Sequence, residues 1–406
     1  MKIMFLVPPR LRKKELFLST QHPIGLGFLM TYIRDLGHEV LFIDYEVEDY
    51  DSDSLIRRCK NFAPDVVGLT AMTPQIVQAH NLAKLLKSHN PALSTVIGGK
   101  HASILPQKTL RSFPAFDYLV VGEGEYTMQE LLEVISKGTS PECVAGLAWR
   151  DGDAVRVNEL RQLIYNLDDI PHPDRSLFQL DLYGKGMSFK GMWRTKRHTE
   201  IITARGCPNN CIFCASQIIT KRRMRYRSVP HLLVELEECR TKYGFKHYRI
   251  VDDTFTINKK RVLSLCEWFA RHKVTFNCNA RVNTVDRRML QVMKDSGCIG
   301  IMYGVESGSQ KILNMMKKGA IVEQAIDAFR WSHEAGIPVI EADFILGGHP
   351  DENMGDINKT RELIKILKPH YLSIGTMVPY PTAILILTET DFGLSFAYHR
   401  LAKITT

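Results

Sequence analysis

Short apolar runs alternate with longer amphipathic stretches along residues 1–140 of the chain. The runs KIMFLVP, EVLFID, VVGLTA, STVIGG and YLVVGEG have the length of buried strands, and several end in glycine. Between them lie stretches such as IGLGFLMTYIRDLGH and QIVQAHNLAKLLKSHNP, whose apolar spacing predicts helices. The alternation predicts an α/β domain, a doubly wound (Rossmann-like) parallel sheet with helices on both faces.

A doubly wound sheet binds its ligand beyond the carboxyl ends of its strands, at a switch point in the strand order. Three loops rich in glycine are expected at that edge, at 70–73, 98–101 and 122–125. Glycine lets the backbone approach a large ligand closely, although it also occurs as plain turn punctuation. The candidate binding residues in these loops are Thr70, Met72, Thr73, Gly98, Gly99, His101, Gly122, Glu123 and Gly124.

The alternation breaks down over residues 141–195 and resumes near Glu200. GLAWRDGDAVRVNE predicts a hairpin turning at Asp151-Gly152, and LDDIPHPDRSLF predicts an extended, proline-stiffened linker. Over 196–380, the strand candidates EIITARG, HYRIVDD, TFNCNAR, IGIMYGV and VIEADFILG alternate with helix candidates at 229–243, 259–272, 286–296 and 321–335. This series predicts a partial (β/α)6 barrel of TIM type, in which functional groups sit where strands end. A short tail, 381–406, is expected to follow it.

Composition places the chain among globular proteins, with 45% hydrophobic and 24% charged residues. The start, MKIMFLVPPRLRKK, fits a first strand better than a signal peptide. The one long uncharged run, 371–388, contains two prolines, so no membrane span is expected and the chain is expected to be cytoplasmic. The net charge of +9 is densest in TKRRMRYRS at 220–228, but a single basic run is usually a solvated face or a set of anchors for anionic groups. Nucleic acid is therefore not favoured as a partner.

Three cysteines, Cys207, Cys211 and Cys214, fall within eight positions, where the first strand of the second series ends. Structural zinc would need a fourth ligand, and Cys239 lies 25 residues beyond Cys214 without a CxxC partner. A disulfide is disfavoured in a reducing compartment. Three thiolates on a four-iron cluster leave one iron open to bind another ligand, so the triplet favours a catalytic iron–sulfur cluster.

The CxxxCxxC motif, with Phe213 before its third cysteine, resembles the radical S-adenosylmethionine superfamily. The resemblance implies that Cys207, Cys211 and Cys214 hold a 4Fe-4S cluster whose open iron binds S-adenosylmethionine. The cofactor is then cleaved to a 5′-deoxyadenosyl radical. The same resemblance implies cofactor contacts at the ends of later strands, although each of these side chains alone could equally be a surface or salt-bridge residue. Those candidates are Asp252 or Asp253 for the methionyl amine, Arg281 for its carboxylate, Glu306 and Ser307 for the ribose, and the loop at Gly347 for the adenine.

The N-terminal half resembles the domain that precedes the barrel in cobalamin-dependent radical enzymes, on the segments PIGLGFLMTYIRDLGHEVLFID, IGGKHASILPQ and DYLVVGEGE. The D-x-H-x-x-G signature, which supplies a histidine ligand in many cobalamin proteins, is absent. The resemblance therefore implies a corrin held without a histidine ligand. His22 and His101 are weaker alternatives as axial ligands.

The resemblance implies a methyltransferase that moves a methyl group through methylcobalamin to an unactivated carbon, or phosphorus, of a small-molecule, lipid or peptide substrate. Two alternatives remain: the same architecture performing cyclisation, ring contraction or oxidation, and a cofactor-binding sensor without turnover. An electron donor such as flavodoxin or ferredoxin is the implied protein partner. At the C-terminus, MVPYPTAILILTETDFG departs from the Pro-Tyr-Pro-Gly-Thr pattern of the family, which weakens any specific substrate assignment.

Overall fold

The first sheet follows the predicted alternation closely. The computed structural model describes residues 1–9, 21–183 and 198–377. The sheet has the strand order β2-β1-β3-β4-β5-β6-β7; the pairs among β1 to β5 are parallel, and β5-β6 and β6-β7 are antiparallel. Its strands are β1 Lys2–Val7, β2 Glu39–Asp44, β3 Val66–Thr70, β4 Ser94–Gly98, β5 Tyr118–Val120, β6 Leu147–Asp151 and β7 Ala154–Val157. The order reverses between β1 and β3, so the ligand-binding edge lies where these two strands end.

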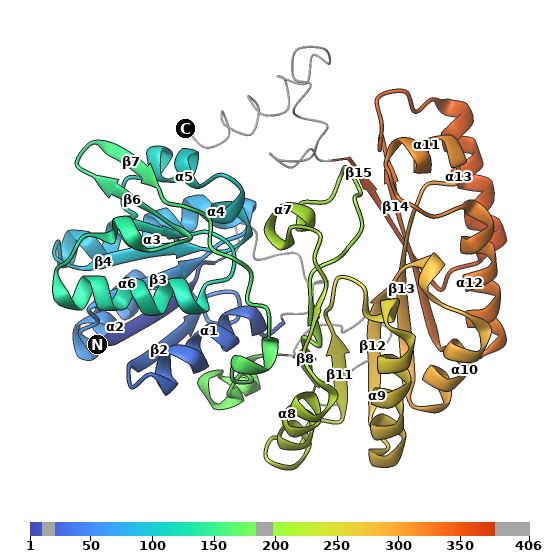
Figure 1. The fold of residues 1–406 in the computed structure, drawn as a ribbon, viewed down its shortest axis with the longest axis horizontal. Helices are drawn as coiled ribbons and strands as arrows, with labels where there is room; N and C mark the ends of the chain where they lie inside the picture. The colour runs from blue at the N-terminus through green and yellow to red at the C-terminus, as the bar shows by residue number, and fades with distance from the viewer. Residues whose placement is uncertain (10–20, 184–197, 378–406) are drawn as a thin grey trace. The chain divides into compact units, whose positions relative to one another are not determined.

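Successive side chains of the first sheet pack on opposite faces, as a strand requires. Ile3 and Phe5 of β1 join one buried apolar cluster, and Met4 and Leu6 join another. Helices α1 and α6 contribute to the first cluster, and α2, α3 and α5 to the second. Figure 1 shows these helices on both sides of the sheet, which confirms the doubly wound fold. Their bounds are α1 Ile24–Asp35, α2 Ser52–Phe62, α3 Ile76–His89, α4 Lys100–Ile104, α5 Pro106–Ser112 and α6 Glu125–Lys137.

The chain divides into two compact units, and each unit is made of two segments that are separate in the sequence. The first contains Met1–Ile201 and Arg225–His247, and the second contains Ile202–Met224 and Tyr248–Thr406. The predicted hairpin forms, and its strands β6 and β7 extend the first sheet beyond residue 140. The domain boundaries at 140 and 195 stay a prediction, and the tail 381–406 lies outside the described residues. The first unit also holds β8 His198–Ile201, β10 Arg225–Tyr226 and α8 Val229–Thr241.

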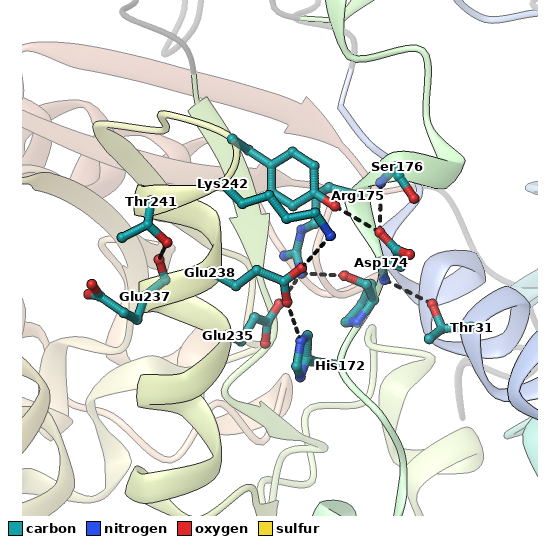
Figure 2. Close-up of polar contacts among 12 residues, drawn as sticks. Thr31, His172, Asp174, Arg175, Ser176, Glu235, Glu237, Glu238, Thr241 and Lys242 are labelled. Atoms are coloured by element: carbon teal, nitrogen blue, oxygen red, sulfur yellow. Dashed lines mark hydrogen bonds and ion pairs between the residues drawn. The ribbon is translucent and has the colours of Figure 1, made fainter.

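The segment predicted to be an extended linker is instead folded against the first unit. It forms short 3-10 turns at Leu167–Asp169, Arg175–Leu177 and Leu180–Leu182. Asp174 accepts hydrogen bonds from the Ser176 N–H at 2.9 Å (Figure 2) and from the Tyr243 hydroxyl at 2.8 Å. It also forms an ion pair with Arg34 of α1, with an N–O distance of 2.5 Å. The prediction of an extended chain was wrong because charged residues of this segment find partners on α1 and near α8.

A buried triad of charges, Arg175, Glu235 and Arg227, fixes this segment to α8. The guanidinium groups of both arginines form ion pairs with the Glu235 carboxylate, and all three residues are at most 1% exposed. Figure 2 shows Arg175 reaching Glu235 on α8. Burial raises the pKa of Glu235, but the charges of Arg175 and Arg227 outweigh it and lower the value to about 2. The carboxylate is therefore ionised, and the triad is a fully charged interior cluster.

The second series of strands forms one sheet in sequence order, β15-β14-β13-β12-β11-β8, which confirms the partial six-stranded barrel. The pairs β12-β13, β13-β14 and β14-β15 are parallel. The bounds are β9 Ala204–Arg205, β11 His247–Ile250, β12 Thr275–Ala280, β13 Cys298–Glu306, β14 Val339–Leu346 and β15 Tyr371–Thr376. The predicted strand EIITARG is interrupted at Ile202 and Thr203, so its halves are β8 and β9.

Helices follow the strands of the second unit as in a βα series. Figure 1 shows α10, α12 and α13 together beside β13 and β14. The helix predictions for 259–272, 286–296 and 321–335 are confirmed within one or two residues, as is that for 229–243. No helix in the described part of the chain is long and apolar enough to cross a membrane. The helices are α7 Ser216–Thr220, α9 Lys259–His272, α10 Arg287–Asp295, α11 Gln310–Met315, α12 Val322–Glu334 and α13 Met354–Leu367.

Candidate functional site

The three motif cysteines follow strand β9 in the second unit. Cys211 is buried, and Cys207 and Cys214 are half-buried. Burial raises the pKa of the Cys214 thiol, and the charges of Asp253, Cys211 and Cys207 raise it further. Cys207 and Cys211 thus lie near enough to Cys214 to disfavour its ionisation, and a bound cation would favour its thiolate.

Two polar side chains donate hydrogen bonds to sulfur in this loop. Asn209 Nδ2 lies 3.2 Å from Cys207 Sγ, and a terminal nitrogen of Arg281 lies 3.5 Å from Cys211 Sγ. Such donors stabilise thiolates and tune the potential of a bound cluster. Within the ranges that the structure describes, no group of three or more His, Cys, Asp or Glu side chains is arranged to hold a metal ion. The three thiols are thus not preset around a single ion, and it is their soft donor chemistry, with hydrogen bonds to two of the sulfurs, that fits an iron–sulfur cluster.

Gly206, immediately before the first cysteine, is required by both its conformation and its surroundings. Its φ is +100°, and a Cβ atom there would lie 2.1 Å from the Arg223 carbonyl oxygen. Any other residue would force the backbone of the 220–223 turn away from the cysteine loop. The start of the loop is therefore packed tightly on this turn.

Asp252, predicted as a contact for the methionyl amine, holds the backbone that leads into the cysteine loop. Its carboxylate accepts hydrogen bonds from the Thr203 N–H at 2.7 Å, the Thr203 hydroxyl at 2.5 Å and the Ala204 N–H at 3.2 Å. These bonds occur where EIITARG breaks into two strands. Burial raises the pKa of this carboxyl to about 6 despite the donors.

Replacing Asp252 by asparagine is expected to remove a pH dependence of stability. The folded-state pKa of about 6 lies above the ordinary 3.8, so this carboxyl contributes stability that is fully present below about pH 4 and is lost as the pH rises through 6. The loss should approach about 3 kcal/mol. Urea unfolding of the parent and of Asp252→Asn between pH 4 and 7 measures it, with Asp253→Asn as the exposed matched control. Parallel stability curves for the parent and Asp252→Asn would contradict the assignment.

Asp253 is the better placed of the two predicted carboxylates to meet a ligand. It is exposed, and its Oδ2 accepts a hydrogen bond from the Ser216 hydroxyl at 2.6 Å. Its charge also raises the pKa of Cys214, so it lies beside the cysteine loop. Of the pair left open by the sequence, Asp253 therefore has the freer carboxylate.

Arg281 follows β12 and is buried beside the cysteine loop. Besides its contact with Cys211, it donates to the Lys318 carbonyl oxygen and, from Nε, to Asn283 Oδ1 at 3.4 Å. These acceptors fix the plane of its guanidinium, which suits bidentate binding of a carboxylate. Its predicted role toward the methionyl carboxylate stays a prediction.

Glu306 forms a buried ion pair that the sequence did not indicate. Its Oε1 accepts a hydrogen bond from Lys318 Nζ at 2.6 Å, and the two side chains are 9% and 5% exposed. Glu306 ends β13 with φ +71°, a left-handed conformation that costs a non-glycine residue free energy. Lys318 Nζ also lies 5.7 Å from the centroid of the Phe213 ring in the cysteine motif. The pair therefore joins the end of β13 to the cysteine loop.

Gly304 makes room for this pair. A Cβ atom at Gly304 would lie 2.5 Å from Glu306 Oε1 and 2.9 Å from Lys318 Nζ. The loop that contributes Lys318 also contacts the cysteine motif through its backbone, because the Ile212 N–H donates to the Met316 carbonyl at 3.1 Å. Residues 316–319 are thus a part of the site that sequence reasoning missed.

The other two predicted contacts for the nucleoside part of the cofactor, Ser307 and Gly347, already have hydrogen-bond partners within the protein. Ser307 is fully buried, and its Oγ bonds to Thr360 Oγ1 at 3.3 Å and accepts from the Ser309 N–H at 3.1 Å. Gly347 has φ +68°, and its N–H donates to the Glu352 carboxylate, which also accepts from the Gly348 N–H at 3.2 Å. Ser307 therefore stabilises a turn, and the Gly347 loop is closed by Glu352.

The predicted loops of the first unit come together at the carboxyl edge of its sheet. The Ala71 N–H donates to the Gly98 carbonyl at 3.4 Å, and His101 Nδ1 lies 3.1 Å from Thr73 Oγ1. The next pair of loops meets through the Gly122 N–H, which donates to Ser103 Oγ at 2.9 Å. Thr70 ends β3, Gly98 ends β4 and is followed by Gly99, Gly124 precedes α6, and Met72 is 48% exposed. These loops form one continuous edge suited to a large ligand.

Two polar residues of the first unit are held by structural partners. Glu123 accepts two hydrogen bonds from Arg225, at 2.7 and 3.0 Å, so its carboxylate is engaged in a buried ion pair. His22 is 4% exposed, lies 2.7 Å from Glu200 through Nδ1, and stacks on Tyr183 at 4.3 Å. The Glu123 carboxylate is thus engaged by Arg225, and the predicted cobalamin role of this residue stays a prediction.

Comparison with known proteins finds a family model for each half of the chain. The B12 binding domain model matches residues 17–132, and the radical SAM superfamily model matches residues 201–364. An uncharacterized methyltransferase of Pyrococcus horikoshii is 34% identical over 94% of this chain and 81% of its own length. The chain belongs to the cobalamin-dependent radical S-adenosylmethionine family. An anaerobic magnesium-protoporphyrin IX monomethyl ester cyclase of Rubrivivax gelatinosus is 28% identical over 94% of the chain and 69% of its own length.

A solved structure supports the fold of this family member. The radical S-adenosylmethionine methyltransferase TsrM of Kitasatospora setae, solved with tryptophan and a cofactor analogue, superposes with a TM-score of 0.77 at 18% identity. The match covers 96% of this chain and 76% of TsrM. At this identity the likeness establishes the architecture alone, and it confirms the predicted order of a B12-binding domain followed by a radical domain.

Membership of the family sets the cofactors of the enzyme as a 4Fe-4S cluster, S-adenosylmethionine and cobalamin. The sequence identified the cysteines that fit the cluster but missed two residues beside them. Asn209 donates a hydrogen bond to Cys207, and Lys318 forms an ion pair with Glu306. No local pattern marks Lys318, since its partner Glu306 lies twelve positions earlier across a helix. The assignment of individual cofactor contacts stays a prediction.

Proposed function

We propose that this protein is a cobalamin-dependent radical methyltransferase that transfers a methyl group to an unactivated carbon, or phosphorus, of a small-molecule, lipid or peptide substrate. The observation that supports methyl transfer most strongly is the 34% identical methyltransferase, which matches 94% of the chain. The cysteine loop, with hydrogen-bond donors on two of its sulfurs, supports radical chemistry.

The residues of the second unit divide the work of holding the cofactors. Cys207, Cys211 and Cys214 hold the cluster, and Arg281 orients the methionyl carboxylate through its fixed guanidinium. Asp253 meets the methionyl amine, and Glu306 accepts a hydrogen bond from the ribose. When bound, the cluster and S-adenosylmethionine supply the radical, and cobalamin supplies the methyl group. The protein contributes position and exclusion of water.

The loops at the edge of the first sheet hold the corrin and its nucleotide tail. Backbone groups of Gly98, Gly99 and Gly122 approach the ligand, while Thr73 and His101 present polar side chains already paired with each other. In this proposal neither His22 nor His101 ligates cobalt. An electron donor of the flavodoxin or ferredoxin kind and a cytoplasmic location complete it.

A second candidate function is radical chemistry without methyl transfer, as in cyclisation or oxidation. The 28% identical magnesium-protoporphyrin ester cyclase supports it. Both functions use the same motifs, so the products must distinguish them. A sensor without turnover would leave S-adenosylmethionine intact.

The deciding experiment is an anaerobic incubation of the reconstituted enzyme with cobalamin, reductant and S-adenosylmethionine, analysed for both nucleosides by mass spectrometry. Methyl transfer is expected to give S-adenosylhomocysteine together with 5′-deoxyadenosine, because two cofactor molecules are used in each cycle. A Cys211→Ala enzyme treated identically is the control for radical cleavage. Deoxyadenosine alone, repeated in the presence of an accepted substrate, would reject the methyltransferase in favour of the second candidate.

A further inference from the structure

Three consecutive cations, Lys221, Arg222 and Arg223, follow α7 in the second unit and are called the tribasic turn here. All three are exposed. Across the described ranges, none of the three side chains has an ion pair or hydrogen bond with another residue. Some other exposed arginines of this unit are paired, such as Arg287 with Glu334 at 3.1 Å and Arg330 with Asp327 at 2.6 Å. The tribasic turn therefore presents three uncompensated charges to solvent.

The backbone of the tribasic turn has a defined conformation. Lys221 and Arg222 have φ values of 50° and 56°, so two successive residues adopt a left-handed conformation that is unfavourable for non-glycine residues. The Arg223 N–H donates to the Thr220 carbonyl at 2.9 Å. The charges consequently project from a turn with a fixed backbone.

This turn lies against the cysteine loop. The Arg223 carbonyl packs so closely on Gly206 that a Cβ atom there would lie 2.1 Å away, and Gly206 is directly followed by Cys207. Helix α7, which leads into the turn, begins two residues after Cys214 and exposes 39% of Ile218. The surface beside the cluster ligands thus combines positive charge with one apolar side chain.

We propose that the tribasic turn is the docking surface for an acidic, low-potential electron-carrier protein that reduces the cluster. This inference rests on the proposed radical function. In each encounter the carrier is oxidised by one electron and the cluster is reduced by one, with no bond made to the carrier. Complexes for electron transfer are small and transient, and complementary charge mainly accelerates their formation. A fixed cationic turn beside the cluster ligands meets both requirements.

A nucleic acid would also be attracted by three cations, but the position of the turn favours the carrier. The turn adjoins the redox ligands, where a carrier must approach, and its neighbour Ile218 offers an apolar contact rather than a stacking platform. Nucleic acid binding is therefore treated as an outcome that overturns the proposal.

The test compares the triple variant Lys221→Gln, Arg222→Gln, Arg223→Gln with the parent enzyme, using the full chain. A matched control, Arg271→Gln, Lys273→Gln, Arg288→Gln, removes three exposed cations that are likewise unpaired in the described structure. Cluster reduction and deoxyadenosine formation are followed with reduced flavodoxin and, separately, with dithionite. At low ionic strength the tribasic variant is expected to lose about tenfold or more of its rate with flavodoxin, because steering by charge raises association at least that much. Its rate with dithionite should equal that of the parent, and the flavodoxin deficit should shrink as salt is added.

Binding of oxidised flavodoxin to the enzyme, measured by calorimetry, provides a readout that needs no turnover. The single variant Arg222→Glu serves if the triple variant fails to fold, and it is expected to weaken binding in the same direction. An unchanged flavodoxin rate and affinity would overturn the proposal, as would an equal fall with dithionite or a selective loss of single-stranded RNA binding. If only the proposed methyl transfer is wrong, flavodoxin will reduce the cluster normally but no S-adenosylhomocysteine will form. The experiment therefore tests the methyltransferase function and the docking surface independently.

Discussion

Replacing Cys211 by alanine is expected to abolish the absorbance of the reconstituted cluster and to reduce deoxyadenosine formation below detection. Cys211 is the buried member of the three cysteines, and Arg281 donates to its sulfur. Removing it leaves two thiols and an unsatisfied guanidinium donor, and two thiolates do not hold a four-iron cluster against loss. Absorption spectra after anaerobic reconstitution and mass spectrometry of the nucleosides measure both effects.

Cobalamin binding by the same variant is expected to remain at the parent level, because the candidate corrin loops belong to the first unit. The control is Cys143→Ala, which removes an exposed thiol of the first unit. Retention of the full cluster absorbance would refute Cys211 as a ligand. Loss of cobalamin as well would show that the first unit depends on the cluster for its fold.

Replacing Lys318 by methionine is expected to weaken S-adenosylmethionine binding and to destabilise the second unit. Methionine fills a similar volume but leaves the buried Glu306 carboxylate without its ion-pair partner. Breaking a buried pair costs about 3–5 kcal/mol. A misoriented Glu306 would also lose the hydrogen bond to the ribose that we propose for it. A bond of this kind contributes about 1.5–3 kcal/mol, so the cofactor dissociation constant should rise about tenfold to a hundredfold. Calorimetric titration and thermal unfolding measure the two effects.

The neighbouring Lys317 gives a matched control, because Lys317→Met removes an exposed ammonium one position away. The double variant Glu306→Gln, Lys318→Met separates the structural role from the binding role. It should recover most of the lost stability, since no unpaired charge remains, but not the affinity for S-adenosylmethionine. Recovery of both would show that the pair is purely structural, and normal affinity in Lys318→Met alone would exclude Glu306 from cofactor binding.

The architecture could be predicted because both halves repeat a simple period. Strands such as VVGLT and VIEADFIL are short apolar runs between amphipathic helices, and that pattern specifies a parallel sheet with little ambiguity. The segment 167–178 could not be predicted in the same way. Its prolines and aspartates read locally as an extended chain, whereas the ion pair of Arg175 with Glu235 connects residues sixty positions apart.

The candidate site was predictable where residue type and spacing carry the chemistry, as in the three cysteines. It was less predictable where burial decides the role. Asp252 and Asp253 are equivalent in sequence, yet one is 3% exposed and holds the Thr203 backbone while the other is exposed to solvent. Similarly, Glu123 reads as part of a glycine-rich loop, but Arg225 engages its carboxylate from a hundred residues away.

The buried triad of Arg175, Glu235 and Arg227 limits the mutational routes open to this protein. Removing one of the three charges leaves the others unpaired in the interior and lowers the free energy of unfolding by about 3–5 kcal/mol. This is a large share of the roughly 5–15 kcal/mol by which a folded domain is stable. Replacing all three together by apolar residues is often neutral or stabilising. Each single step from the charged arrangement towards the apolar one therefore passes through a destabilised variant. A variant lacking the triad is therefore reached more readily from a background with surplus stability.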